Sequence, residues 1–264
     1  MGASGDARGL RARSVTVGYG KDAPILEDLS LDVLQGQLTV IVGPNACGKS
    51  TLLRSLARVL GVRSGVVELD GRALTTMNQK ELARRLGLLA QSSTAPADIL
   101  VEDLVARGRY PHQSILRQWS AEDDEAVAWA MRQAGVEALA RRRVGELSGG
   151  QRQRVWIAMV LAQSTDIVLL DEPTTYLDLN HQLEVLRLAR RLQADGRTIV
   201  AVLHDLHLAF RYATHLVCMK EGRIVAQGAP GDIVTPALIE EVFDVPCLII
   251  EDPQTGSPLV VPRP

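Results

Sequence analysis

Residues 38–61 of the chain read LTVIVGPNACGKSTLLRSLARVLG, and this stretch decides the fold. Its first five residues form a short apolar run bounded by glycine, which is typical of a buried strand. After the glycine-rich turn, apolar residues recur at helical spacing, at Leu52, Leu53, Leu56 and Val59. Gly61 is placed to end that helix. The stretch therefore predicts a strand, a turn and a helix in the order that begins an α/β fold.

The turn has the form G-x-x-x-x-G-K-[ST], which cradles phosphate groups between a strand and a helix. Its glycines let backbone N–H groups point inward, and the start of the helix adds a partial positive charge. Lys49 is placed to reach the β- and γ-phosphates of a nucleotide, and the Ser50 hydroxyl is placed to bind Mg²⁺. The residues expected to hold the nucleotide here are Gly43, Pro44, Asn45, Ala46, Cys47, Gly48, Lys49, Ser50 and Thr51. We interpret Cys47 as a small filler and not as a nucleophile.

A second apolar strand, IVLLDE at residues 167–172, ends in two carboxylates. The carboxyl end of a strand is the edge where α/β sheets bind their ligands. We expect Asp171 to hold Mg²⁺ and Glu172 to orient or deprotonate the attacking water. Together with the phosphate loop, the pair predicts a nucleotide-hydrolysing site.

The composition of the 264 residues narrows the functional class. A hydrophobic share of 46% allows a full core, and the formal charge of −2 gives no basic field for nucleic acid. Three widely spaced cysteines form no disulfide framework or zinc site and favour a reducing compartment. The apolar runs are far shorter than the ~20 residues of a membrane helix, so we expect no membrane span.

The middle of the chain, from about residue 96 to 163, predicts a mostly helical insertion between the apolar strands. Ser120 followed by Asp123 indicates a capping box at the start of one of its helices. We interpret the acidic run at residues 122–125 as a solvated first turn and not as a metal site. Residues 1–13 and 251–264 are expected to be tails flanking one folded region.

Residues 147–154, LSGGQRQR, resemble the signature of ATP-binding cassette (ABC) proteins. A serine hydroxyl and two glycine amides at a helix N-terminus would form a second anion cradle. The resemblance covers about residues 14–250. It implies an α/β fold with a P-loop NTPase (RecA-like) core, an antiparallel β subdomain, and a helical insertion at about 96–163 that carries the signature.

The resemblance also implies roles for residues whose types alone say little. Tyr19 is similar to the aromatic that stacks on adenine, and His204 is similar to the switch histidine that contacts the γ-phosphate. Gln91 resembles the glutamine that links Mg²⁺ and water to the helical subdomain, and Asp178 ends a segment resembling the D-loop. In the family the second cradle closes on a nucleotide held by another copy, and its residues here are Ser148, Gly149, Gly150 and Gln151. The implied ligands are ATP and Mg²⁺, with Ser50, Gln91 and Asp171 as metal ligands.

Two segments depart from the family pattern. Ala46 stands where the phosphate loop usually has glycine, and we expect a negative φ there and an intact site. The D-loop has Thr175 and Tyr176 where Ser-Ala is commoner, and the threonine keeps the hydroxyl.

A single cassette without a membrane segment resembles the separate ATPase subunit of ferric-siderophore, haem and cobalamin importers. Residues 107–113, RGRYPHQ, lie where that family meets the coupling helix of its permease, and we expect their Arg, Tyr and His to be exposed. The implied partners are a second copy in a head-to-tail dimer, an integral membrane permease and, indirectly, an extracytoplasmic binding protein. The implied location is the cytoplasmic face of the plasma membrane.

Two alternatives stay open at this point. The importer could carry haem, cobalamin or another substrate instead of an iron–siderophore complex, because the cargo would not touch this chain. A cassette ATPase acting on nucleic acid or ribosomes is the second alternative. That class usually has paired cassettes, long coiled-coil arms or basic extensions, none of which this sequence contains.

Overall fold

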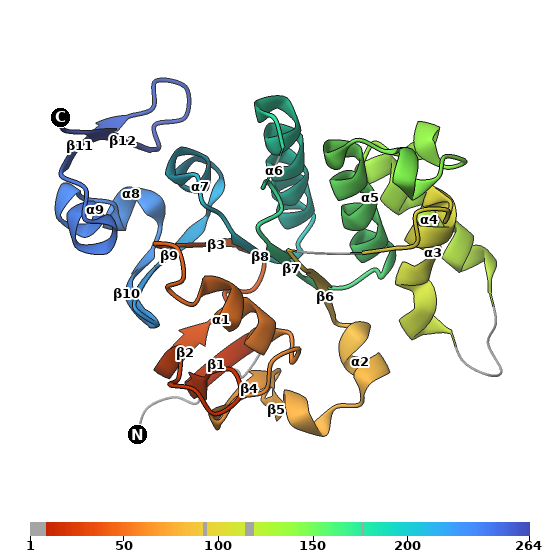
Figure 1. Cartoon of the computed structure of the whole chain (residues 1–264), viewed down its shortest axis with the longest axis horizontal. Helices are drawn as coiled ribbons and strands as arrows, with labels where there is room; N and C mark the ends of the chain where they lie inside the picture. Colours follow the sequence, from red (N-terminus) through yellow and green to blue (C-terminus); the bar gives the residue numbers. More distant parts are fainter. Residues whose placement is uncertain (1–8, 92–93, 114–118, 176) are drawn as a thin grey trace. The chain divides into compact units, whose positions relative to one another are not determined.

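The computed structural model describes residues 9–91, 94–113, 119–175 and 177–264, and it divides the chain into two compact units (Figure 1). The first unit is Met1–Met77 together with Gly196–Pro264, and the second is Asn78–Asp195. No helix in the described part of the chain is long and apolar enough to cross a membrane.

An antiparallel sheet in the first unit begins earlier than the sequence predicted. It comprises β1 (Leu10–Val17), β2 (Leu26–Asp32), β4 (Ser64–Leu69) and β5 (Arg72–Ala73), in the order β2-β1-β4-β5. The predicted tail at residues 1–13 is wrong for its last four residues. Leu10 and Ala12 are buried and pair with strands on both sides, so their apolar burial holds them in the sheet. Residues 1–8 lie outside the described part of the chain.

The second sheet of this unit carries the phosphate loop. Its strands are β3 (Leu38–Val42), β8 (Thr198–Val202), β9 (His215–Lys220) and β10 (Arg223–Gly228). β3 lies between β8 and β9 and is parallel to both, and every residue of β3 and β8 is buried. Parallel strands are covered on both faces, and this explains why the two strands are continuous apolar runs in the sequence. The helices of the unit are α1 (Lys49–Leu56), α7 (Leu206–Tyr212), α8 (Pro230–Ile233) and α9 (Pro236–Phe243), with the 3-10 turn η1 (Leu74–Thr76).

Helix α1 is shorter than the apolar spacing predicted. It ends at Leu56, and Val59 is 66% exposed, so the prediction that Gly61 ends the helix is wrong. Arg58 adopts a left-handed conformation with φ of 56°, and its guanidinium donates to the carbonyls of Leu74 and Met77. These tertiary hydrogen bonds end α1 before Val59, where the apolar spacing in the sequence still continues.

The C-terminal segment is also ordered, which corrects the predicted tail at 251–264. β11 (Cys247–Glu251) and β12 (Pro258–Pro262) form an antiparallel hairpin. One face buries Cys247 and Val260, where the hairpin packs on α9 and α7. The alternation of buried and exposed residues along β12 has the period of a half-buried strand.

The second unit combines two parallel strands with helices. β6 (Leu86–Leu89) pairs in parallel with β7 (Ile167–Asp171). The helices are α2 (Gln79–Ala83), α3 (Val101–Ala106), α4 (Ala121–Gln133), α5 (Gly149–Ala162) and α6 (Leu179–Ala194), with 3-10 turns η2 (Arg107–His112), η3 (Glu137–Leu139) and η4 (Val144–Glu146). α3 and α4 both pack against α5, which is green in Figure 1.

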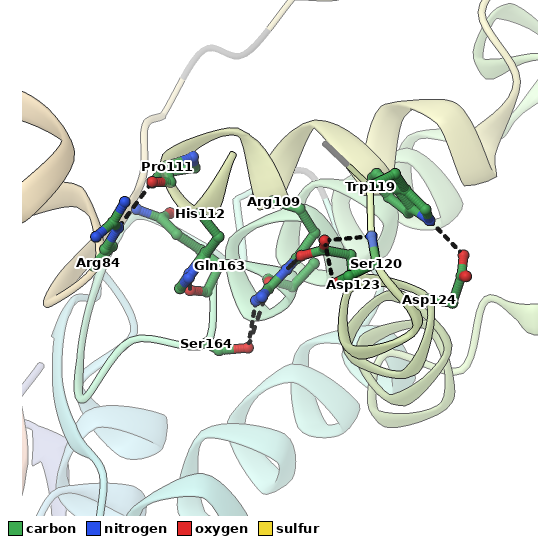
Figure 2. Close-up of polar contacts among 11 residues, drawn as sticks. Arg84, Arg109, Pro111, His112, Trp119, Ser120, Asp123, Asp124, Gln163 and Ser164 are labelled. Atoms are coloured by element: carbon green, nitrogen blue, oxygen red, sulfur yellow. Dashed lines mark hydrogen bonds and ion pairs between the residues drawn. The ribbon is translucent and has the colours of Figure 1, made fainter. Parts of the chain in front are cut away.

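A buried ion pair joins η2 to α4 and α5, and it overturns two predictions. Arg109 is 1% exposed and was predicted to be exposed; Asp123 is also 1% exposed and was predicted to be solvated. Figure 2 shows the Arg109 Nε donating to the Asp123 carboxylate at 2.8 Å, while Nη1 donates to the Ala162 carbonyl at 2.9 Å and to the Ser164 hydroxyl at 3.0 Å. One residue of the acidic run at 122–125, Asp123, is therefore a buried anion, and the Arg109 guanidinium balances its charge.

The same carboxylate forms the capping arrangement predicted at the start of α4. Asp123 accepts from the backbone N–H and the hydroxyl of Ser120 at 3.0 and 2.8 Å. Burial alone would raise the pKa of Asp123, but the hydrogen bonds from Arg109 and Ser120 outweigh burial and hold the pKa below its usual value. The Asp123 carboxylate is therefore ionised at neutral pH.

Candidate functional site

The phosphate loop of the first unit runs from the end of β3 at Val42 to the start of α1 at Lys49. Its outer side is closed by the turn between β9 and β10. A Cβ at Gly43 would lie 2.2 Å from the Met219 carbonyl oxygen, so this position accepts only glycine. The Gly222 N–H donates to the Cys47 carbonyl at 3.0 Å. Neighbouring backbone therefore fixes the loop before any ligand binds.

Ala46 departs from its predicted conformation. Its φ is 61°, in the left-handed region, so the prediction of a negative φ is wrong. The fixed loop demands this conformation from whichever residue occupies the position. An L-residue with a Cβ bears a cost of about 1–2 kcal/mol there.

Lys49 is a buried cation without a buried anion. Its side chain is 5% exposed, and Nζ donates to the carbonyls of Gly43 at 2.9 Å and Pro44 at 2.8 Å. Among the described residues of its own unit, no carboxylate lies within ion-pair distance of it. The Cys47 sulfur is 4.0 Å away, and burial raises the pKa of that thiol despite the nearby ammonium, so Cys47 stays a neutral filler. The ammonium is left to be neutralised by an anion from outside.

Two other predicted residues lie in the same unit as the loop. His204 follows β8, and the parallel pairing of Ile41 with Val202 brings it to the sheet edge from which the phosphate loop leaves. His204 is exposed there. Tyr19 follows β1, is 45% exposed, and its carbonyl accepts from Arg63 at 3.1 Å. Its ring is accessible to an aromatic ligand.

In the second unit, the ends of β6 and β7 bring Gln91 and Glu172 together. The strands are parallel with Leu89 opposite Leu170, so their following residues lie at one edge. Gln91 Nε2 donates to Glu172 Oε2 at 2.7 Å, and the Thr175 hydroxyl donates to the same oxygen at 3.2 Å. Asp171 is fully buried at the end of β7. The predicted glutamine and the second residue of the predicted acid pair are thus directly hydrogen-bonded.

The second predicted anion cradle lies at the start of α5. Ser148 is the N-cap: its hydroxyl accepts from the Gln151 N–H at 3.3 Å, and the Gln151 side chain accepts from the Ser148 N–H at 3.1 Å. Nothing lies within 4 Å of a Cβ placed at Gly149. The N–H groups of a 14-residue helix begin beside an open glycine, which suits a phosphate.

Sequence reasoning missed the side chains that hold the segment between β7 and α6. Gln153 Nε2 on α5 donates to the Pro173 carbonyl at 3.2 Å, and Gln182 Nε2 on α6 donates to the Leu177 carbonyl at 3.0 Å. Asp178, at the end of this segment, caps α6 and accepts from the His181 N–H at 2.9 Å. The sequence analysis identified Asp178, but it gave no role to Gln153 or Gln182, which only the tertiary structure identifies. Tyr176 lies outside the described residues.

The predicted docking stretch at 107–113 divides into a buried and an exposed part. Arg109 is buried, and Figure 2 shows His112 turned to the Gln163 carbonyl, to which Nε2 donates at 2.8 Å. Tyr110 is 66% exposed, and the Lys80 ammonium lies 4.9 Å from the centre of its ring. An open hollow of about 590 Å³ is lined by Asp103, Ala106, Arg107, Tyr110, Gln113 and Trp119. The exposed part of the stretch is therefore aromatic, and the buried Arg109 and the hydrogen-bonded His112 anchor it to the unit.

The fold, the phosphate loop around Lys49 and the hydrogen-bonded Gln91 and Glu172 are features of a nucleotide-binding cassette. Comparison with known proteins leads to the same class. The family model described as ABC transporter matches residues 26–175. The chain belongs to the ABC transporter family.

Named relatives match almost the whole chain. It is 55% identical to the ferric enterobactin transport ATP-binding protein FepC of Escherichia coli K12, over 96% of this chain and 93% of the relative. It is 51% identical to the siderophore transport system ATP-binding protein YusV of Bacillus subtilis, over 96% and 92%. The hemin import ATP-binding protein HmuV of Rhodococcus jostii is 44% identical, over 96% and 86%.

Solved structures of similar fold include a metal-chelate type ABC transporter in an inward-facing conformation. It matches with a TM-score of 0.82 and 26% identity, over 98% of both chains. The dimeric cassette MJ0796 matches with a TM-score of 0.74 and 26% identity, over 83% of this chain and 98% of that one.

Proposed function

We propose that the chain is the ATP-hydrolysing subunit of an importer for ferric siderophores. The observation that carries the ATPase part is Lys49, a buried ammonium held by two carbonyls in a pre-formed loop. A buried cation is costly unless paired, and a nucleotide's β- and γ-phosphates supply the missing negative charge.

The oxygen donors expected at the metal position suit Mg²⁺. Ser50 offers a hydroxyl and Asp171 a fully buried carboxylate, and oxygen atoms of these kinds are the ligands that Mg²⁺ prefers. Gln91 donates through Nε2 to Glu172, so its amide oxygen remains an acceptor facing away from that bond. When bound, Mg²⁺ would neutralise charge on the phosphate oxygens.

Glu172 is the residue that we assign to the attacking water. Two donors, Gln91 and Thr175, hold its Oε2, and this fixes the orientation of the carboxylate. A carboxylate so held can accept a proton from water without moving. His204 is assigned to the γ-phosphate and Tyr19 to the adenine ring, which its exposed position permits.

Glu172→Gln tests this assignment. The amide keeps the shape but loses the basicity, so hydrolysis should fall by about 100-fold or more while ATP affinity is kept. Phosphate release and nucleotide titration measure the two effects. Glu125→Gln, at an exposed position on α4, is the matched control. Wild-type hydrolysis by Glu172→Gln would remove Glu172 from the mechanism.

Each nucleotide site is proposed to be shared between two copies. Ser148, Gly149 and Gly150 of one copy would bind the γ-phosphate held by Lys49 of the other, as suits an open helix N-terminus. The dimeric state of the MJ0796 cassette supports this arrangement.

Mixing two inactive variants tests the shared site. Lys49→Ala and Ser148→Arg each break both sites of a homodimer. A mixed dimer has one site with both lesions and one with neither, so mixing should restore part of the hydrolysis, or nucleotide trapping at one site per dimer. Absence of both signals, with mixed dimers shown to form, would contradict sharing.

The transport part of the proposal rests on the relatives and on the exposed aromatic surface. FepC and YusV are named for siderophore transport, and HmuV for hemin. We assign the hollow at Tyr110 and Trp119 to a helix of an integral membrane permease at the cytoplasmic face of the plasma membrane. A binding protein outside the cell would deliver the cargo. Cells lacking this chain should lose uptake of iron–siderophore complexes; loss of haem uptake alone would reassign the cargo.

A further inference from the structure

His181 lies at the start of α6, outside every motif that the sequence contains. Its Nδ1 donates to Asp178 Oδ1 at 2.8 Å, and its backbone N–H donates to the same oxygen at 2.9 Å. Both bonds come from one residue, so the Asp178 carboxylate is held toward its own helix. Chiefly because of these bonds, the pKa of Asp178 is below its usual value, and the carboxylate stays charged.

The His181 ring also reaches the second anion cradle. A Cβ placed at Gly150 would lie 3.4 Å from its Cγ and Nδ1, and 3.6 Å from Cδ2 of Leu177. The His181 ring of α6 and the Leu177 side chain of the preceding segment therefore lie beside Gly150, at the distance where an added methyl group would touch both. Leu177 is buried, and the His181 side chain is 28% exposed.

We propose that His181 is a positioning residue for ATP hydrolysis, which fixes Asp178 and the signature loop at residues 147–151 as one unit. The inference rests on the proposed function. The two hydrogen bonds orient Asp178, and the ring carries that orientation to Gly150. Gln153 and Gln182 hold the carbonyls of Pro173 and Leu177 in the same segment. A displacement of the signature loop therefore also moves Asp178. When two copies close, the signature loop and Asp178 reach the nucleotide bound by the other copy together.

Two substitutions separate the hydrogen bond from the packing. His181→Leu fills a similar volume without a donor, whereas His181→Asn places an N–H donor where Nδ1 was. In the full-length chain with MgATP, we expect His181→Leu to lower kcat roughly tenfold. KM for ATP should change less than about twofold, because the phosphate loop is intact. His181→Asn should restore most of the kcat.

The same change at the exposed His207 of α7 is the matched control and should leave kcat unchanged. Thermal unfolding of each variant shows that it is folded, and His181→Ala, which also lacks a donor, replaces His181→Leu if the latter is not. A wild-type kcat in His181→Leu overturns the inference, as does equal loss in His181→Leu and His181→Asn.

Lys49→Ala, measured in parallel, distinguishes failure of the inference from failure of the proposed function. If Lys49→Ala hydrolyses ATP at the wild-type rate, the proposed function falls. If Lys49→Ala is inactive and His181→Leu is fully active, only the role of His181 falls.

Discussion

Two buried cations serve opposite purposes in this chain. Lys49 is 5% exposed and is held by two neutral carbonyls, whereas Arg109 is 1% exposed and is paired with a buried carboxylate. Arg109 carries its counter-charge within the fold, and the charge of Lys49 is balanced only when an anion binds. Burial alone therefore does not mark a functional cation; the missing counter-charge does.

The largest effect should come from removing the cation that lacks an anion. Lys49→Ala should lower ATP hydrolysis by at least about 100-fold, because the charge facing the transferred phosphate is lost. The free energy of unfolding should stay within about 1 kcal/mol of the wild type, since the relieved desolvation of the ammonium offsets the lost packing. Phosphate release and denaturant unfolding measure the two quantities. If Lys49→Ala strongly lowers the free energy of unfolding, Lys49 contributes to stability as Arg109 does, and the contrast between the two cations is wrong.

Removing the paired cation should reverse this pattern. Arg109→Met leaves Asp123 buried without its guanidinium and should lower the free energy of unfolding by about 3 kcal/mol. ATP affinity of the folded protein should be unchanged. Adding Asp123→Leu should recover most of the stability, since no unpaired charge then remains. If the double variant is as unstable as Arg109→Met, the lesion is lost packing and not lost charge.

Acid should weaken the Arg109–Asp123 pair selectively. The pKa of Asp123 is lower in the folded chain than its ordinary value of 3.8. Its contribution to stability is therefore full above pH 3.8 and is lost as pH falls through the folded value. The stability difference between wild type and Asp123→Asn, followed by urea unfolding, should shrink below about pH 4. A difference that stays constant through this range would contradict the lowered pKa.

The smallest effect on stability should come from the exposed surface that the buried pair supports. Tyr110→Ala should change the free energy of unfolding by less than about 0.5 kcal/mol, because the ring is mostly in solvent. ATP affinity should persist, while copurification with the permease and iron uptake should fall. Trp129→Ala, at a half-buried position on α4, is a control of similar chemistry. Full copurification of Tyr110→Ala would move the docking surface elsewhere.

The sequence predicted the parts of the site whose geometry is local. The strand, turn and helix around Lys49 follow from apolar spacing and glycine, and Ser148 begins a helix as its residue type favours. Gln91 and Glu172 meet because β6 and β7 are parallel and end at one edge. The sequence predicted the strand before Glu172, whereas the role of Gln91 was implied only by the family resemblance.

Features that depend on distant partners were not predictable. Arg109 lies in a 3-10 turn without helical periodicity, and its carboxylate partner is 14 residues away. α1 stops early because Arg58 bonds to carbonyls at Leu74 and Met77. Ala46 takes its φ from the loop around it and not from its own preference. His181 belongs to no motif because its proposed role depends on its position beside Gly150 of another helix.

The left-handed Ala46 has a consequence for how freely this loop can change over generations. An alanine there costs about 1–2 kcal/mol in the folded chain. Glycine removes that cost but gives the unfolded chain about 0.4–1 kcal/mol more conformational entropy. The two terms cancel in part, and their difference of about 0–1.6 kcal/mol is small beside a typical stability of about 5–15 kcal/mol. Exchange between glycine and alanine at this position is therefore close to selectively neutral, whereas a bulkier or β-branched residue would be purged.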